Sequence, residues 1–173
     1  MINQAQVVEA IRSATRDVFT TMLGLEVESA DPYTEIQVAL PSEGIIAVIG
    51  MAGAWVGTAS ICCSASFACL MATQMLGMEY TAVEEDVLDA VAEIANMVVG
   101  NFKTSAEGRL GLLGLSIPTV IYGLNFRART AGREQWIVVP FRCRGANLDV
   151  KICLTPNRGL PRTLTPQLFR SAQ

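Results

Sequence analysis

The chain has 173 residues, of which 51% are hydrophobic, and its formal net charge is −3. This length can bury one sizeable core, so we expect a single domain over residues 1–155 and a Pro- and Arg-containing tail over residues 156–173. The chain contains no histidine, which excludes Ser-His-Asp triads, Cys-His dyads and histidine-based zinc sites.

The first predicted element is an amphipathic helix over residues 3–22. Its apolar residues recur at spacings of three and four, which places them on one helix face. They are Val7, Ile11, Ala14, Val18 and Met22. No apolar leader with a cleavage site opens the chain, so we expect a cytoplasmic protein. Alternation of Ile36, Val38 and Leu40 then predicts a half-buried strand over residues 34–40.

Residues 44–78 form a stretch of 35 positions without a charged side chain. A membrane-spanning helix needs about 20 apolar residues, but Gly50, Gly53 and Gly57 interrupt this run. We therefore expect no membrane insertion but a pair of strands that turns at residues 50–53, followed by a buried helix over residues 66–77. The five cysteines include no C-x-x-C and lie in apolar surroundings, which predicts buried thiols and no metal site or disulfide framework.

The longest predicted helix begins where Thr81 and Glu84 fit a capping box, and it runs to about Glu107. A loop of sequence GLLGLSIP follows, and four alternating segments then predict a meander of antiparallel strands. They are PTVIYG, NFRART, EQWIVVPFRC and ANLDVKICL. Leu-Gly-Leu follows both long helices, at 23–25 and 113–115, as an internal pseudo-duplication would require. The predicted fold class is α+β, with long helices packed on a mainly antiparallel sheet.

The charges are distributed unevenly between the two halves of the chain. Residues 1–100 hold thirteen acids and two bases, whereas residues 101–173 hold eleven bases and three acids. A basic half can indicate a nucleic-acid face, but these bases form no clustered run. The two halves can also neutralise each other within one fold, so we expect no nucleic-acid partner and rank that hypothesis last.

The sequence DAVAEIANMVVGN at residues 89–101 holds the only E-x-x-N in the chain. At 100° per residue, Glu93 and Asn96 project away from the buried face, together with Asp89 and Gly100. Side chains at i and i+3 can converge on one small object. Exposed acids and amides are common on helices and need no function. However, Asn96 and Gly100 disfavour a helix interior by about 0.5 and 1 kcal/mol relative to alanine, which indicates a surface shaped for contact.

An amide and a carboxylate without histidine support a narrow range of chemistry. The amide of Asn96 can accept from and donate to a water molecule, and the carboxylate of Glu93 can bind a cation on a partner. Phosphoryl transfer needs mainly positioning of this kind. The pair is therefore a candidate site for orienting a water that attacks phosphorus.

Asp89, Glu93 and Asn96 form D-x-x-x-E-x-x-N, and Pro118 follows after 21 intervening residues. This set resembles the signature of the CheC/CheX/FliY family of chemotaxis phosphatases, although the spacing to the proline differs slightly. The segments GMEY, SIPTVIYG and IGMAGAWVGTASI also resemble their counterparts in the CheX branch. The chain carries the motif once, as members of that branch do.

The resemblance implies a CheC-like two-layer fold and an enzyme that hydrolyses the aspartyl phosphate of a CheY-type response regulator. It implies that Asn96 orients the attacking water, that Glu93 pairs with the regulator's active-site lysine and that Pro118 shapes the following strand. Asp89 and Gly100 are the further supporting candidates from their places on the helix, and the role of Asp89 beyond helix polarity stays open. It further implies a homodimer, no cofactor of its own, and Mg²⁺ held by the partner's receiver domain. The alternative is a binding module of the same fold that docks on a regulator, motor or sensor component without catalysis.

Overall fold

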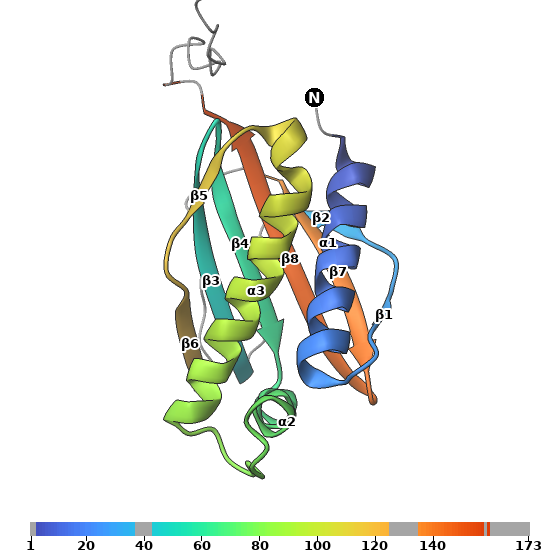
Figure 1. Cartoon of the computed structure of the whole chain (residues 1–173), viewed down its shortest axis with the longest axis vertical. Helices are drawn as coiled ribbons and strands as arrows, with labels where there is room; N and C mark the ends of the chain where they lie inside the picture. Colours follow the sequence, from blue (N-terminus) through green and yellow to red (C-terminus); the bar gives the residue numbers. More distant parts are fainter. Residues whose placement is uncertain (1–2, 37–42, 125–134, 158, 160–173) are drawn as a thin grey trace, which may run out of the picture.

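The computed structural model describes residues 3–36, 43–124, 135–157 and 159, and in them the helices lie on one face of a single sheet (Figure 1). The helical elements are α1 (Gln4–Val18), the π-helical turn η1 (Phe19–Leu23), α2 (Ala65–Leu76) and α3 (Glu85–Leu110). The strands are β1 (Glu28–Ser29), β2 (Tyr33–Glu35), β3 (Glu43–Gly53), β4 (Trp55–Cys63), β5 (Leu113–Leu115), β6 (Thr119–Leu124), β7 (Trp136–Cys143) and β8 (Ala146–Pro156). α1 and α3 pack against each other, side by side on the same face of the sheet, and α2 lies at one end of the sheet (Figure 1). This arrangement confirms the predicted α+β fold.

Among the described residues, eight strands form the sheet, in the order β1-β7-β8-β4-β3-β5, with β2 also paired to β7 and β6 to β3. All of these pairs are antiparallel. The pairing has the same form at both ends, because the short strands after α1 pair with β7 and those after α3 pair with β3. A repeated helix-and-strands unit would produce this order, while duplication of the sequence itself stays a prediction.

Side-chain caps fix the N-terminal ends of α1 and α2, and a left-handed glycine ends α2. Asn3 begins α1 through a capping box, in which its Oδ1 accepts from the Gln6 amide at 2.9 Å and its own amide donates to Gln6 Oε1 at 3.1 Å. Ser64 begins α2, since its Oγ accepts from the amide of Phe67 at 3.2 Å. Gly77 ends α2 with φ of 71°, a conformation that glycine adopts without strain. The helix predicted over residues 66–77 is thereby confirmed.

The meander predicted for the C-terminal segments is wrong in one respect. β7 and β8 form a hairpin as expected, but β6 pairs with β3 on the other side of the central strands. Alternation shows which face of a strand is buried and not which strand is its neighbour, so it left this pairing open. NFRART, at residues 125–130, lies outside the described residues. The predicted loop GLLGLSIP contains β5, which pairs with the end of β3.

Two predictions in the first third of the chain need correction. Met22 is 47% exposed, because the wider turn of η1 moves the buried contacts to Phe19 and Leu23. The strand predicted over residues 34–40 ends at Glu35, and Ile36 is exposed. Residues 37–40 lie outside the described residues.

The strand pair β3–β4 is confirmed, although the chain reverses after residues 50–53, which still belong to β3.

The capping box predicted at Thr81 and Glu84 is wrong, because α3 begins at Glu85 with Glu84 as its N-cap residue. Tyr80 explains the later start. Its amide donates to Thr73 Oγ1 at 3.1 Å and its hydroxyl donates to Asp86 at 3.0 Å, which holds residues 81–84 in a non-helical link. The helix also continues past the expected end near Glu107 to Leu110.

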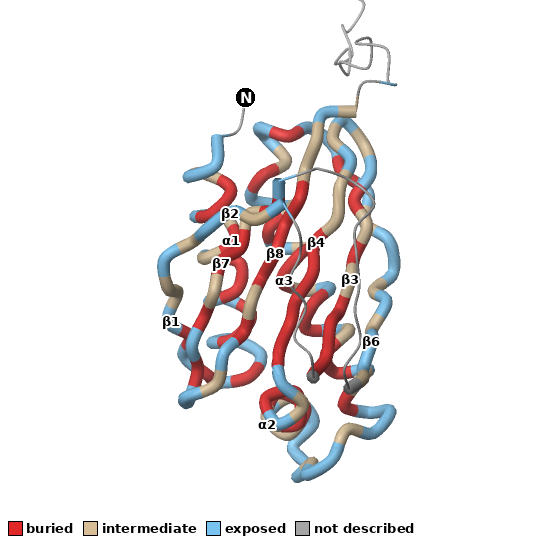
Figure 2. Tube along the Cα trace, turned by 180° about the vertical axis from the view of Figure 1, so that it is seen from behind, coloured by how far each residue is buried: buried red, intermediate tan, exposed pale blue. Residues whose placement is uncertain are grey.

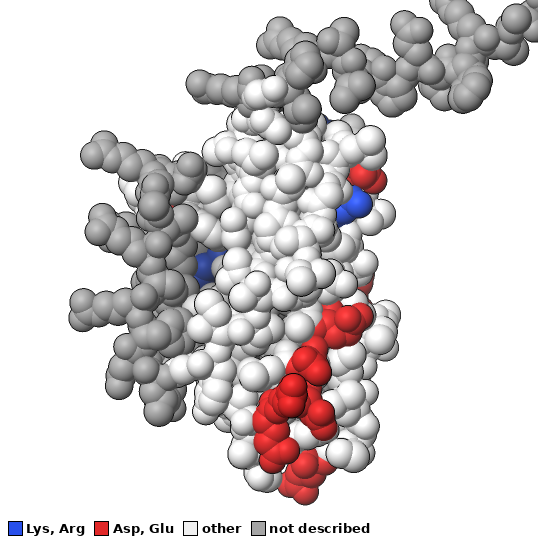
Figure 3. Space-filling model, turned by 90° about the vertical axis from the view of Figure 1, so that its left-hand side faces the viewer, with Lys and Arg blue, Asp and Glu red and all other residues white. Residues whose placement is uncertain are grey.

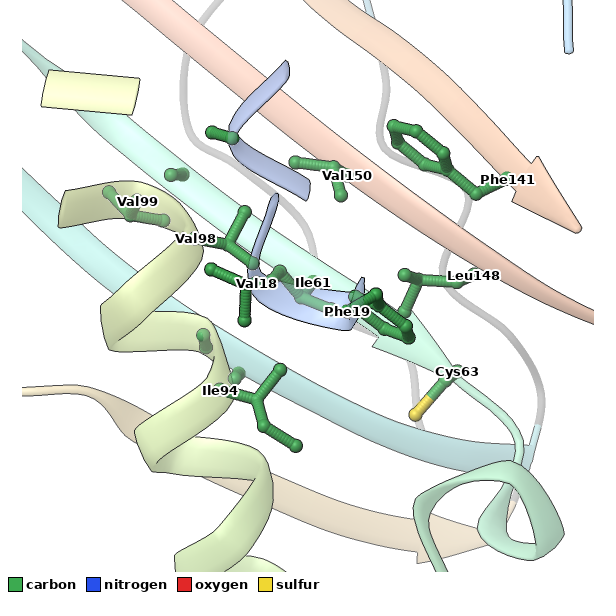
Figure 4. Close-up of a cluster of buried hydrophobic side chains, with 14 of the residues drawn as sticks. Val18, Phe19, Ile61, Cys63, Ile94, Val98, Val99, Phe141, Leu148 and Val150 are labelled. Atoms are coloured by element: carbon green, nitrogen blue, oxygen red, sulfur yellow. The ribbon is translucent and has the colours of Figure 1, made fainter. Parts of the chain in front are cut away.

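The core lies between the helices and the sheet (Figure 4). Phe19 of η1 stacks on Phe67 of α2, with ring centroids 6.3 Å apart. Ile94 and Val98 of α3 are buried on the same side of the sheet as Ile61 of β4 (Figure 4). In β4 and β8 successive residues are buried in unbroken runs, 59–63 and 150–153, so both faces of these central strands are covered (Figure 2). No helix in the described part of the chain combines the length and apolar character required to cross a bilayer.

The five cysteines are all buried, as predicted. Burial raises the pKa of Cys62 to about 11 and the pKa of Cys63 to about 12. Both thiols are therefore protonated near neutral pH and unreactive as nucleophiles. Trp136 is buried, whereas Trp55 is half-buried and packs against the core.

Candidate functional site

The outer face of α3 presents Glu93 and Asn96 to solvent. The residues predicted for the inner face are all at most 1% exposed. They are Val87, Val91, Ile94, Val98 and Phe102. Asp89, Glu93 and Asn96 are exposed, and their side chains make no hydrogen bond or ion pair with any other described residue. The helix is therefore anchored by one face while the polar groups on the other are available to a partner.

Glu93 and Asn96 are close enough to act on one object. Residues three positions apart in a helix have Cβ atoms roughly 5–6 Å apart and rise by about 4.5 Å along the axis. Gly100 follows one turn after Asn96, and a Cβ built on it would meet nothing within 4 Å. Its carbonyl accepts from Thr104 Oγ1 at 3.0 Å, on the far side of the helical turn from Asn96. The surface beside Asn96 is thus open to close approach.

Pro118 lies apart from this group, immediately before β6, an outer strand that α3 contacts. The turn that carries it is fixed by Ser116. The Oγ of Ser116 accepts from the Gly50 amide at 2.9 Å and donates to the Ile117 carbonyl at 2.9 Å. A proline at the first position before a strand removes a donor that the sheet does not need there. The position of Pro118 fits the shaping of this connection.

The N-terminal half of α3 and the link before it carry a strongly acidic surface. Six exposed carboxylates lie there: Glu79, Glu84, Glu85, Asp86, Asp89 and Glu93. No lysine or arginine occurs anywhere in residues 17–102. Figure 3 shows the acidic side chains gathered at one end of this face. The acids of the first turn also meet the positive end of the helix dipole. Positive charge on a partner would complement this surface.

A shallow concavity of about 580 Å³ adjoins Glu93, between the end of α2 and the start of α3. It is lined by Met75, Leu76, Met78, Tyr80, Asp86, Asp89, Ala90 and Glu93. Sequence reasoning missed its apolar wall, because the helix over residues 66–77 was expected to be buried. Leu76 and Met78 are 45% and 58% exposed. The sequence signal that could have revealed this wall is the position of Leu76 and Met78 on either side of Gly77, the glycine that ends the helix.

Within the described residues, no three Cys, Asp or Glu side chains are grouped so as to hold a metal ion. The chemical capacity of the exposed face therefore lies in hydrogen bonding and charge. The amide of Asn96 can align a water molecule, and the carboxylate of Glu93 can bind an ammonium group. Both groups project from one rigid helix, which is the arrangement that positioning requires.

A family model described as Chemotaxis phosphatase CheX matches residues 45–142, more than half of the chain. The chain is 26% identical to the CheY-P phosphatase CheX of Thermotoga maritima over 129 residues, which cover 74% of this chain and 83% of that protein. The fold is similar to that of the chemotaxis protein CheX from Vibrio vulnificus, with a TM-score of 0.75, 28% identity, and coverage of 86% of this chain and 99% of that chain. It is also similar to the CheX-CheY-BeF3-Mg²⁺ complex from Borrelia burgdorferi, with a TM-score of 0.71, 25% identity, and coverage of 85% and 96%.

Proposed function

Because this chain belongs to the CheX family of chemotaxis phosphatases, we propose that it hydrolyses the aspartyl phosphate of a CheY-type response regulator. One observation supports the assignment of this activity to particular residues. Glu93 and Asn96 are exposed and unpaired on the outer face of α3, in the spacing of the family motif, while the inner face of the same helix is buried. A pair held in this way can enter the active site of a partner without rearrangement of its own fold.

The proposed reaction is attack of water on an acyl phosphate. The water oxygen forms a bond to phosphorus, the bond between phosphorus and the aspartyl oxygen breaks, and the aspartate leaves as a carboxylate with the electron pair. Both protons of the water remain on the inorganic phosphate, which is released as H2PO4⁻. The side-chain carbonyl of Asn96 accepts a hydrogen bond from the water and aims its lone pair along the line of attack. An acyl phosphate is already labile, so orientation supplies most of the acceleration that is needed.

Glu93 has a different role in this proposal. Its carboxylate pairs with the active-site lysine of the regulator and so fixes where Asn96 enters. We place the Mg²⁺ in the receiver domain of the partner. The similar structure from Borrelia burgdorferi, a complex of CheX with CheY, BeF3 and Mg²⁺, supports both the partner and the metal.

The remaining residues of the motif support the pair. Gly100 leaves room for the partner beside Asn96, Pro118 shapes the connection into β6, and Asp89 adds charge one turn before Glu93. We further propose that residues 1–155 form one domain and that the protein acts in the cytoplasm as a homodimer. Within the described residues β6 pairs only with β3, so its other edge is one at which a second copy can pair.

A phosphate-decay assay with phosphorylated receiver domains tests the proposal. The wild-type protein should shorten the phosphate half-life of its regulator, and Asn96→Ala should reduce that acceleration by about 100-fold or more, because the water is no longer aligned. Asn101→Ala is the matched control, since Asn101 is an exposed asparagine of the same helix outside the motif. Full acceleration by Asn96→Ala would contradict the assigned role. Binding of the regulator without any change in phosphate half-life would favour the non-catalytic binding module.

A further inference from the structure

We propose that the concavity between α2 and α3 is a docking site for the receiver domain, which inserts an apolar side chain flanked by lysine or arginine. This inference rests on the proposed function and deepens it, because the concavity adjoins Glu93 without including Asn96. It adds residues outside the motif, above all Leu76 and Met78, to those that recognise the partner. The motif then carries the reaction, and the α2–α3 concavity selects what reacts.

The apolar wall provides the first argument. Leu76 ends α2, and Met78 follows the left-handed Gly77, so neither side chain reaches the core. At 45% and 58% exposure, both leave apolar surface in water beside the half-buried Met75 and Tyr80. Methionine is unbranched and adapts to the shape of a bound side chain, which makes it common in binding surfaces. Apolar surface of this kind next to a reactive group is best explained by a partner that covers it.

The polar side of the concavity fixes the chemistry of the occupant. Asp86, Asp89 and Glu93 line it, and no base occurs nearby in the sequence. Asp86 accepts a hydrogen bond from the Tyr80 hydroxyl at 3.0 Å. Desolvation and this hydrogen bond raise the pKa of Tyr80, so the hydroxyl remains the donor. An occupant therefore meets an apolar wall on one side and negative charge on the other, which an apolar residue between basic residues complements.

The position along α3 connects docking to the reaction. Asn96 follows Asp89 by seven positions, which corresponds to about 10 Å along the helix axis. Glu93 lies between them, in both the concavity and the motif. A receiver domain seated in the concavity thus reaches Asn96 with its active site at a fixed offset. Changes in the apolar wall should alter how often the regulator is seated and not how fast the seated complex reacts.

The experiment compares Leu76→Ser with Met78→Ser, singly and together, against Leu112→Ser as the control. Leu112 is 75% exposed but follows the C-terminal end of α3 at Leu110, whereas the concavity lies at the start of that helix. Affinity is measured by calorimetry for a receiver domain loaded with BeF3⁻ and Mg²⁺, and kinetics by phosphate decay over a range of phosphatase concentrations. The double variant should weaken affinity and raise the half-saturating concentration by about tenfold each, with the maximal rate unchanged. Leu112→Ser should change none of the three, and Asp86→Asn should make the affinity of the complex less sensitive to salt.

The outcomes separate this inference from the proposed function. If wild type is active, Asn96→Ala is inactive, and the double variant binds and saturates like wild type, then the docking inference is overturned and the function stands. If no regulator loses phosphate faster but the double variant binds about tenfold more weakly, then the catalytic proposal fails and the docking site stands. If no regulator loses phosphate faster and the double variant binds like wild type, then the catalytic proposal and the docking inference are both overturned.

Discussion

Gly100 offers a test in which stability and activity should move in opposite directions. It lies in the interior of α3, where glycine disfavours the helix by about 1 kcal/mol relative to alanine. A Cβ added there would meet nothing within 4 Å, so no clash offsets the gain. Gly100→Ala should therefore stabilise the protein by about 1 kcal/mol, which corresponds to a rise in Tm of roughly 2–4 °C for a chain of this size. Gly100→Gln should gain somewhat less, because glutamine is a slightly weaker helix former than alanine.

The same glutamine side chain projects one turn after Asn96, onto the surface that the regulator must approach. Gly100→Gln should reduce the acceleration of phosphate decay by about tenfold at a fixed concentration while the fold becomes more stable. Urea unfolding and the phosphate-decay assay measure the two effects on one preparation. Gly108→Ala is the control, because Gly108 also has open space around its Cβ position but lies near the end of the helix. A fully active Gly100→Gln would refute the idea that the surface beside Asn96 must stay open.

Two further predictions concern the sheet. Gly57→Ala should destabilise the protein by more than about 3 kcal/mol in urea unfolding, because its Cβ would overlap the Cys153 carbonyl oxygen across β4 and β8. Gly114→Ala should be nearly neutral, since the nearest atom there is 3.5 Å away, and equal losses in both variants would contradict the steric argument. Burial raises the pKa of Asp149 above its ordinary value, so the stability that its protonation contributes is full at low pH and is lost as pH rises through the folded-state pKa. Asp149→Asn should accordingly be more stable than wild type at pH 7 and lose that advantage near pH 3, and an advantage that grows on acidification would show the sign to be wrong.

The features that could be predicted from the sequence were those that local periodicity decides. The buried face of α3 is set by the helical repeat alone, so the exposure of Glu93 and Asn96 could be predicted without knowing what α3 packs against. The start of the same helix could not be predicted in this way. Thr81 and Glu84 fit the capping-box pattern, although the helix begins only at Glu85. Contacts of Tyr80 with side chains six and seven positions away decide it instead.

Features that depend on two distant segments were not predictable in this way. The pairing of β6 with β3 joins residues 71 to 81 positions apart, and alternation carries no information about the partner strand. The α2–α3 concavity likewise needs the end of one helix and the start of the next. Leu76 looks like a core residue in sequence, and only the termination of α2 at Gly77 places it in solvent.

The strand order also governs how the chain can be made. The ribosome synthesises β4 long before β8, yet these strands are neighbours in the sheet. Trp55 of β4 pairs with Pro156 of β8, 101 positions later. β1 and β2 likewise have no partner until β7 is synthesised. Contacts between such distant segments form slowly. A nascent chain that ends after α3 therefore exposes one edge of β4 with its apolar residues, so shortened translation products should aggregate instead of folding.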